Sequence, residues 1–110
     1  MRFVRSDRFK ADYRRLSEAE RASVREAVLE FAGACDRFVR DGTAFPARLR
    51  VKPITGAPGV FEMTWSFAGS DGRATWEWVE VDVSDGSGRS SKAPAVRWRR
   101  LGDHGILREP

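Results

Sequence analysis

The chain has 110 residues, the length of one domain, which excludes a two-domain enzyme with a separate cofactor module. Hydrophobic residues make up 41% of it and charged residues of both signs 33%, while the formal charge of +4 favours polyanions or an acidic protein as partners. No apolar stretch is long enough to span a membrane and no secretory signal follows Met1, so we expect no membrane contact and a cytoplasmic location.

The first part of the chain predicts a short strand and two helices. Phe3 and Val4 form an apolar start, and Ser6 or Asp7 can cap a helix up to about residue 16 that is apolar on one face and basic elsewhere. Ser17 and Glu20 then have the spacing of a capping box, which opens a second helix. Its apolar side chains recur every three or four positions, at Val24, Val28, Phe31, Cys35 and Phe38, and Asp41-Gly42 ends it.

From Leu49 onward the apolar residues follow the two-residue period of strands. Leu49 and Val51 alternate with Arg50 and Lys52, and a turn rich in Pro and Gly follows over residues 53–59. The clearest strand predicted is 61–67, with Phe61, Met63, Trp65 and Phe67 on one face. A tight reversal is expected at residues 69–72.

The last third of the chain predicts two more strands and a loop. A strand beginning at Arg73 has Trp76 and Trp78 on one side, but its apolar phase slips at Val79, which predicts a bulge or a strong twist. Residues 84–94 predict a mobile hairpin loop, and the final strand runs from Val96 to about residue 101.

Together these elements predict one α+β domain over residues 1–110. An N-terminal strand and a two-helix hairpin would pack on one face of a twisted, mainly antiparallel sheet of about four strands.

Strand alternation predicts a basic face on the side of the sheet away from the helices. If the helices cover the apolar faces, the other face carries Arg50, Lys52, Glu62, Thr64, Arg97 and Arg99. Guanidinium and ammonium groups at these positions would suit a phosphate backbone. The alternative is an ordinary solvated strand face with ion pairs such as that between Glu62 and Lys52.

His104 is the default candidate for proton transfer, because histidine exchanges protons near neutral pH more readily than other side chains. It follows the strand that carries Arg97, Arg99 and Arg100, so its ring could lie over a phosphate held by those arginines. The alternative is a structural or merely exposed histidine. Cys35, on the apolar face of a helix, is expected to be an inert core thiol, and the single Cys and His leave no Cys/His metal site.

Several short motifs, in their order along the chain, resemble the RelE/ParE superfamily of toxins from bacterial toxin–antitoxin pairs. Residues 8–16 resemble the first helix of that family, 49–52 its second strand, and 59–63 the entry to its central strand. Arg73 with Trp76 is similar to an arginine that precedes an aromatic strand. The ending Arg99-Arg100-Leu101-Gly102-Asp103-His104 is similar to that of the YafQ-like branch, whereas Glu62 and Thr64 stand where many relatives have basic residues.

The resemblance implies a metal-independent endoribonuclease, without a cofactor, that cuts mRNA on the translating ribosome and is neutralised by a cognate antitoxin protein. It implies that His104 transfers protons, that Lys52, Arg73 and Arg99 stabilise the phosphate or the transition state, and that Arg50, Arg97 and Arg100 hold RNA. Two alternatives stay open: a ParE-like toxin that inhibits DNA gyrase without catalysis, and a non-toxic relative that binds RNA or protein.

Overall fold

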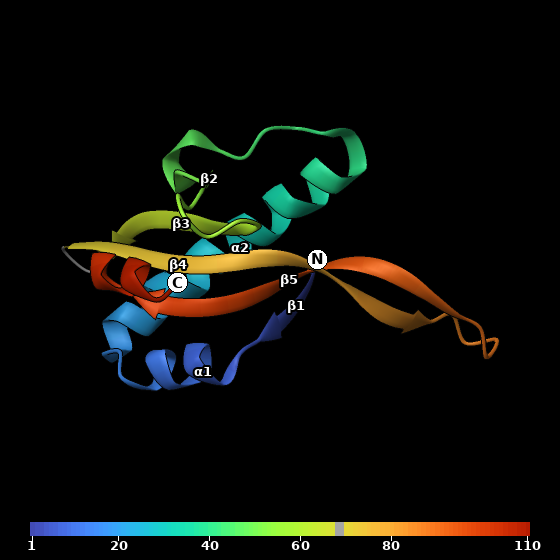
Figure 1. The fold of residues 1–110 in the computed structure, drawn as a ribbon, viewed down its shortest axis with the longest axis horizontal. Helices are drawn as coiled ribbons and strands as arrows, with labels where there is room; N and C mark the ends of the chain where they lie inside the picture. Colours follow the sequence, from blue (N-terminus) through green and yellow to red (C-terminus); the bar gives the residue numbers. More distant parts are fainter. Residues whose placement is uncertain (68–69) are drawn as a thin grey trace.

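The computed structural model of the chain describes residues 1–67 and 70–110, and it has the predicted α+β architecture (Figure 1). Its elements in order are β1 (Arg2–Arg5), α1 (Asp7–Arg14), α2 (Glu18–Asp41), the short 3-10 helix η1 (Ala47–Leu49), β2 (Lys52–Pro53), β3 (Val60–Phe67), β4 (Ser70–Ser84), β5 (Ser90–Gly102) and the 3-10 helix η2 (His104–Arg108). The strands form one sheet in the order β1-β5-β4-β3-β2. The sheet therefore has five strands rather than about four, because β1 joins it in parallel to β5 and the short β2 adds to β3.

Both helices begin where their capping residues predict. The Ser6 hydroxyl accepts a hydrogen bond from the backbone N–H of Phe9 at the start of α1. At the start of α2, Ser17 and Glu20 form both hydrogen bonds of a capping box. Gly42 ends α2 at φ 78°, a left-handed conformation that glycine adopts without a steric penalty.

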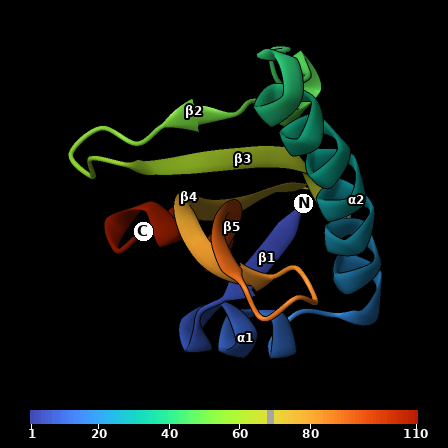
Figure 2. The same cartoon turned by 90° about the vertical axis from the view of Figure 1, so that its right-hand side faces the viewer.

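The core lies between the sheet and the two helices. Figure 2 shows α2 along one face of the sheet and the C-terminal turn on the opposite side. Phe31 of α2 packs edge-on against Trp76 of β4, with ring centroids 5.0 Å apart, and Phe9 of α1 stacks on Trp98 of β5 at 5.6 Å. These four aromatic side chains are buried, so both helices are held to the sheet through aromatic contacts.

The strand predicted from Leu49 is wrong in its first part. Leu49 ends the 3-10 helix η1, Arg50 takes the left-handed conformation at φ 46°, and the strand itself spans only Lys52–Pro53. Burial explains the difference: Leu49 is 2% exposed, and the 3-10 turn that follows Pro46 directs it into the core. Arg50 is consequently not in a strand beside Lys52 as predicted, and it pairs instead with Asp71 at 3.3 Å.

The pairing of β4 with β5 contains the predicted irregularity, but at another position. The register shifts between Thr75 and Trp76 of β4, so that β5 holds one extra residue, Arg99, between the partners of those two. The phase slip at Val79 predicts the bulge a few residues further along β4. The alternation of β5 is therefore shifted by one residue at Arg99. The side chains after Arg99 do not lie on the faces that simple alternation, counted from those before it, predicts.

The hairpin predicted over residues 84–94 exists, but its loop is shorter. The two strands stay paired as far as Ser84 and Ser90, which leaves only residues 85–89 for the turn. An ion pair of 2.6 Å between Lys92 and Asp82 links the strands here. Because β3 pairs with β4 only up to Glu77, β4 and β5 continue beyond the sheet as a two-stranded ribbon, visible in Figure 1 as the gold and orange arm.

Two further sequence-based expectations concern the ends of these strands and the membrane. Part of the reversal predicted at 69–72 lies outside the described residues, as does the side chain of Phe67, and β4 has already begun at Ser70. Across residues 1–67 and 70–110, neither helix combines the length and the apolar character that crossing a membrane would require.

Candidate functional site

Two of the predicted phosphate-binding cations meet on the sheet face away from α2, around a carboxylate. Glu62 of β3 is only 4% exposed, and its Oε1 lies 3.3 Å from Nζ of Lys52 and 3.3 Å from Nη1 of Arg73. Nη1 of Arg73 is also 3.3 Å from the hydroxyl of Thr64. The Lys52–Glu62 ion pair, which the sequence offered as the alternative to a free basic face, is therefore formed.

The sequence offered the pairing of Glu62 with Lys52, but it did not predict that the same carboxylate also pairs with Arg73. Strand parity had placed Glu62 on the correct face, and the register of β2 with β3 sets it directly opposite Lys52. Next to it, Nε of Arg73 and the hydroxyl of Thr75 are buried without a hydrogen-bond partner among the described residues. Glu62 thus compensates two cations, and the cluster keeps a net positive charge.

The three arginines of β5 do not form one cluster. Arg99 pairs with Glu77 at 2.5 Å and its Nε donates to the carbonyl oxygen of Pro110. Arg100 turns to α1, where its Nε donates to Oδ2 of Asp12 at 2.8 Å. The bulge at Arg99 accounts for this divergence. Arg97 is exposed and forms no ion pair within the described residues.

Asp12 is a second residue that the sequence did not single out. It is 7% exposed and accepts hydrogen bonds from Arg100 and from the backbone N–H of Leu101, the latter at 3.0 Å. A carboxylate that binds both a side chain and a backbone group of the next element ties α1 to β5. The Asp12–Arg100 pair therefore has a structural role, and the predicted RNA contact of Arg100 would compete with it.

His104 begins the 3-10 helix η2 and is exposed. In the part of the chain that the structure describes, it takes part in no hydrogen bond or ion pair. The helix η2 packs against β4 and β5 through the buried Ile106, and Gly102, two residues before His104, lies opposite Arg73 in the ladder. The imidazole is thus at the Arg73 end of the sheet and open to solvent.

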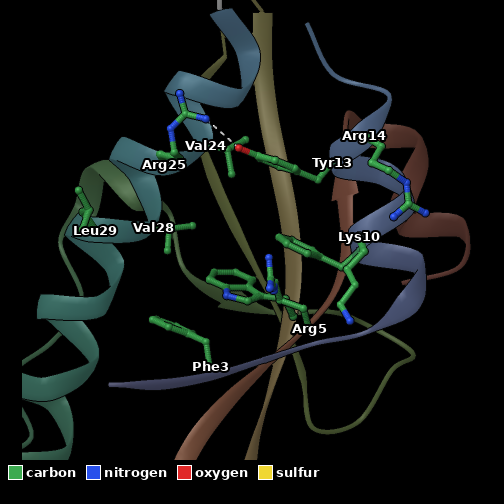
Figure 3. Close-up of a pocket in the computed structure, with 11 residues that line it drawn as sticks. Phe3, Arg5, Lys10, Tyr13, Arg14, Val24, Arg25, Val28 and Leu29 are labelled. Atoms are coloured by element: carbon green, nitrogen blue, oxygen red, sulfur yellow. Dashed lines mark hydrogen bonds between the residues drawn. The ribbon is translucent and has the colours of Figure 1, made fainter. Parts of the chain in front are cut away.

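A separate feature, an apolar groove of about 680 Å³, lies between the two helices. It is lined by Phe3 and Arg5 of β1, by Phe9, Lys10, Tyr13 and Arg14 of α1, by Val24, Arg25, Val28 and Leu29 of α2, and by Trp98 of β5. Figure 3 shows α1 and α2 on opposite sides of this groove, with β1 crossing below and the valines of α2 pointing into it.

The groove combines an apolar interior with a basic border. Arg5, Lys10, Arg14 and Arg25 supply the charged groups of the lining, and no Asp or Glu is among the residues that line it. Arg25 donates a hydrogen bond of 2.8 Å to the hydroxyl of Tyr13, a contact that joins α2 to α1 (Figure 3). From the sequence, the apolar residues of this lining are expected in the core. Local periodicity does not give the angle between the two helices, so the groove could not be predicted from it.

Two further predictions from the sequence concern metal ligands and the Cys35 thiol. The described residues include no group of three or more His, Cys, Asp or Glu side chains that could hold a metal ion. Burial raises the pKa of the Cys35 thiol to about 12, and the neighbouring Asp36 adds to this rise. The thiol therefore stays protonated near neutral pH, as an inert core group does.

Comparison of the chain with protein-family models, with curated proteins and with solved structures finds no match. The resemblance to the RelE/ParE superfamily therefore stays a prediction that rests on the motifs of the sequence.

Proposed function

We propose that the protein is one half of a two-protein pair and that it binds an acidic amphipathic helix of its partner in the groove between α1 and α2. The observation that carries this proposal is the composition of the groove: apolar side chains line its interior, four cations border it, and no carboxylate is part of the lining. A helix with one apolar face and acidic flanks is complementary to that arrangement.

The open form of the groove, between two helices, is compatible with a helical partner. It is open to solvent between two helices (Figure 3), and an added helix of about 10 Å diameter would lie beside both. Apolar side chains are accessible in the groove: Leu29 is 75% exposed, and Val28 and Phe3 are only partly buried. Burying one large aliphatic side chain contributes about 1.5 to 3 kcal/mol, so the interior supplies most of the affinity.

The basic border of the groove determines that the partner's contacting surface should carry negative charge. Exposed ion pairs contribute at most about 1 kcal/mol each, but several charges of one sign accelerate association and disfavour partners of the same sign. The RelE/ParE resemblance implies an antitoxin as partner, and this groove is where we propose that such a protein binds. In that case the chain is the toxin of the pair, acting in the cytoplasm.

A synthetic amphipathic helix tests this proposal. We expect an 18-residue peptide with leucines at helical spacing and glutamates on both flanks to bind the protein. Leu29→Glu should lower the affinity for this peptide about tenfold, because the new carboxylate removes apolar area and repels the acidic flanks. Fluorescence anisotropy of the labelled peptide measures the affinity. Val39→Glu, at an exposed apolar residue of α2 outside the groove, is the matched control.

Two outcomes would contradict the proposal. One is equal affinity of the wild type and the Leu29→Glu variant. The other is a lysine-flanked peptide of the same apolar sequence that binds as tightly as the glutamate-flanked one.

As a second candidate function we propose a metal-independent endoribonuclease that cuts mRNA on the translating ribosome. The specific observation in its favour is that Lys52 and Arg73 lie together near the end of β5, from which the exposed His104 follows. In this reaction a base removes the proton of the ribose 2′-hydroxyl, and the oxygen attacks the adjacent phosphate while cations stabilise the added negative charge. The bond between phosphorus and the 5′-oxygen then breaks, and an acid protonates the leaving 5′-oxygen. His104 would transfer the proton, and Lys52, Arg73 and Arg99 would face the phosphate.

The histidine separates this candidate from the others. His104→Ala should reduce mRNA cleavage during in vitro translation at least a hundredfold, because loss of a general acid or base has about that effect. Arg108→Ala, an exposed residue of the same 3-10 helix, should cleave as the wild type does. Full growth inhibition by the His104 variant, together with loss of DNA supercoiling, would favour the gyrase-inhibiting alternative instead. If the wild type neither cleaves mRNA nor inhibits growth, a non-toxic binding protein is favoured.

A further inference from the structure

The ribbon formed by β4 and β5 has an open edge. From Trp78 to Ser84, β4 pairs with β5 on one side, but β3 no longer accompanies it on the other. Within the described residues this stretch makes no backbone hydrogen bond besides the ladder with β5. In an antiparallel pair, half of the backbone N–H and C=O groups of a strand point away from its partner, and here no strand pairs with them; we term this side the β4 edge, on the arm visible in Figure 1.

Three other strand edges that the structure describes, those of β2, β5 and β1, carry residues that discourage pairing. The strand β2 is only two residues long and includes Pro53. The free edge of β5 carries Lys92 and Pro94, and β1 has an arginine at each end of its four residues. Short length, proline and charged side chains, lysine above all, are usual means by which proteins protect strand edges, and the charged residues of the β4 edge, Glu80 and Asp82, are both acidic. The β4 edge contains no lysine, no proline and no bulge.

The side chains of the β4 edge alternate in a way that defines a partner. Val79, Val81 and Val83 are half-buried on one face, where Val81 lies opposite Ala93 of β5. Glu80 and Asp82 are exposed on the other face. An extended segment beside this edge would need apolar side chains on the valine face and cations next to the two carboxylates.

We propose that the β4 edge binds an extended segment of a partner protein in which apolar and basic residues alternate, as an additional strand of the ribbon. Backbone hydrogen bonds to the edge would hold the segment, and Glu80 and Asp82 would select its charge. This site is separate from the groove between α1 and α2, whose basic border selects the opposite charge. The proposal therefore does not depend on the function of the groove.

A second copy of the chain is a less suitable occupant. If two β4 edges paired antiparallel around Val81, Glu80 of each copy would face Asp82 of the other. Like charges directly opposite each other destabilise a pair of strands. Lys92 offsets only part of this repulsion, because its ammonium group is already paired with Asp82 at 2.6 Å.

Binding of a labelled ten-residue peptide of alternating valine and lysine to the full chain tests the proposal. We expect the amide signals of residues 78–84 to shift in NMR titrations, and an alternating valine–glutamate peptide to bind at least tenfold more weakly. Glu80→Lys should weaken the basic peptide about tenfold, whereas Glu26→Lys, the same charge change at an exposed position of α2, should not.

A third peptide distinguishes strand addition from mere charge attraction. N-methylation of alternate backbone nitrogens removes the donors that pair with the edge while the lysines remain. Equal binding of the methylated peptide would overturn the proposal, and so would amide shifts confined to other parts of the chain. Concentration-dependent dimerisation of the protein through the same edge, without peptide, would overturn the choice of occupant.

Discussion

At the scale of single residues, the buried carboxylates organise the structure more than the arginines that the sequence brings to attention. Asp12 and Glu62 are both almost fully buried, and each binds at least one cation from another element. A charge buried at this depth is tolerated only when it is paired and hydrogen-bonded, so its partner is fixed as well. Arg73 and Arg100 therefore owe their positions to these acids.

The Asp12–Arg100 pair gives a direct test of this point. Asp12→Asn should lower the free energy of unfolding by about 2 kcal/mol, because it leaves the largely buried Arg100 guanidinium without a counter-charge. Chemical denaturation with linear extrapolation measures the change. Asp82→Asn, which removes one partner of a solvent-exposed pair, should have a much smaller effect on stability. Equal losses in the two variants would show that Asp12 has no special structural role.

At the scale of the elements, the features that depend on residues close together in the sequence were predictable. Ser17 and Glu20 specify the start of α2 through hydrogen bonds within one turn, so the capping box was recognised without a structure. The local alternation of Leu49 with Arg50 predicts a strand. The burial of this leucine under the core aromatic residues is a tertiary contact, and this contact decided in favour of a 3-10 turn.

In the candidate sites, too, features that depend on local sequence were predictable and features that depend on tertiary structure were not. Strand parity and register put Lys52 and Glu62 on one face, and the sequence showed both residues. The pairing of Arg100 with Asp12 was not predictable, because the bulge at Arg99 changes the direction in which the following side chain points. The groove could not be predicted either, since its residues belong to four elements whose mutual angles are set only on folding.

At the scale of the whole molecule, the net charge of +4 is distributed unevenly. On the open face of the sheet, Lys52 and Arg73 share the carboxylate of Glu62 and Arg99 is paired with Glu77, so carboxylates offset most of the positive charge there. The border of the groove has no carboxylate in its lining, so the excess of positive charge acts there next to exposed apolar surface. Electrostatic attraction and apolar burial therefore coincide in the groove, which is why a protein partner is the function that we place first.

The location of the acidic amphipathic peptide on the isotopically labelled protein, mapped by NMR, is the most direct test of this account. We predict that the amide and side-chain signals of Tyr13, Arg25 and Val28 shift together as the groove fills. Shifts centred on Lys52, Arg73 and Arg99, with the signals of the groove unchanged, would contradict it.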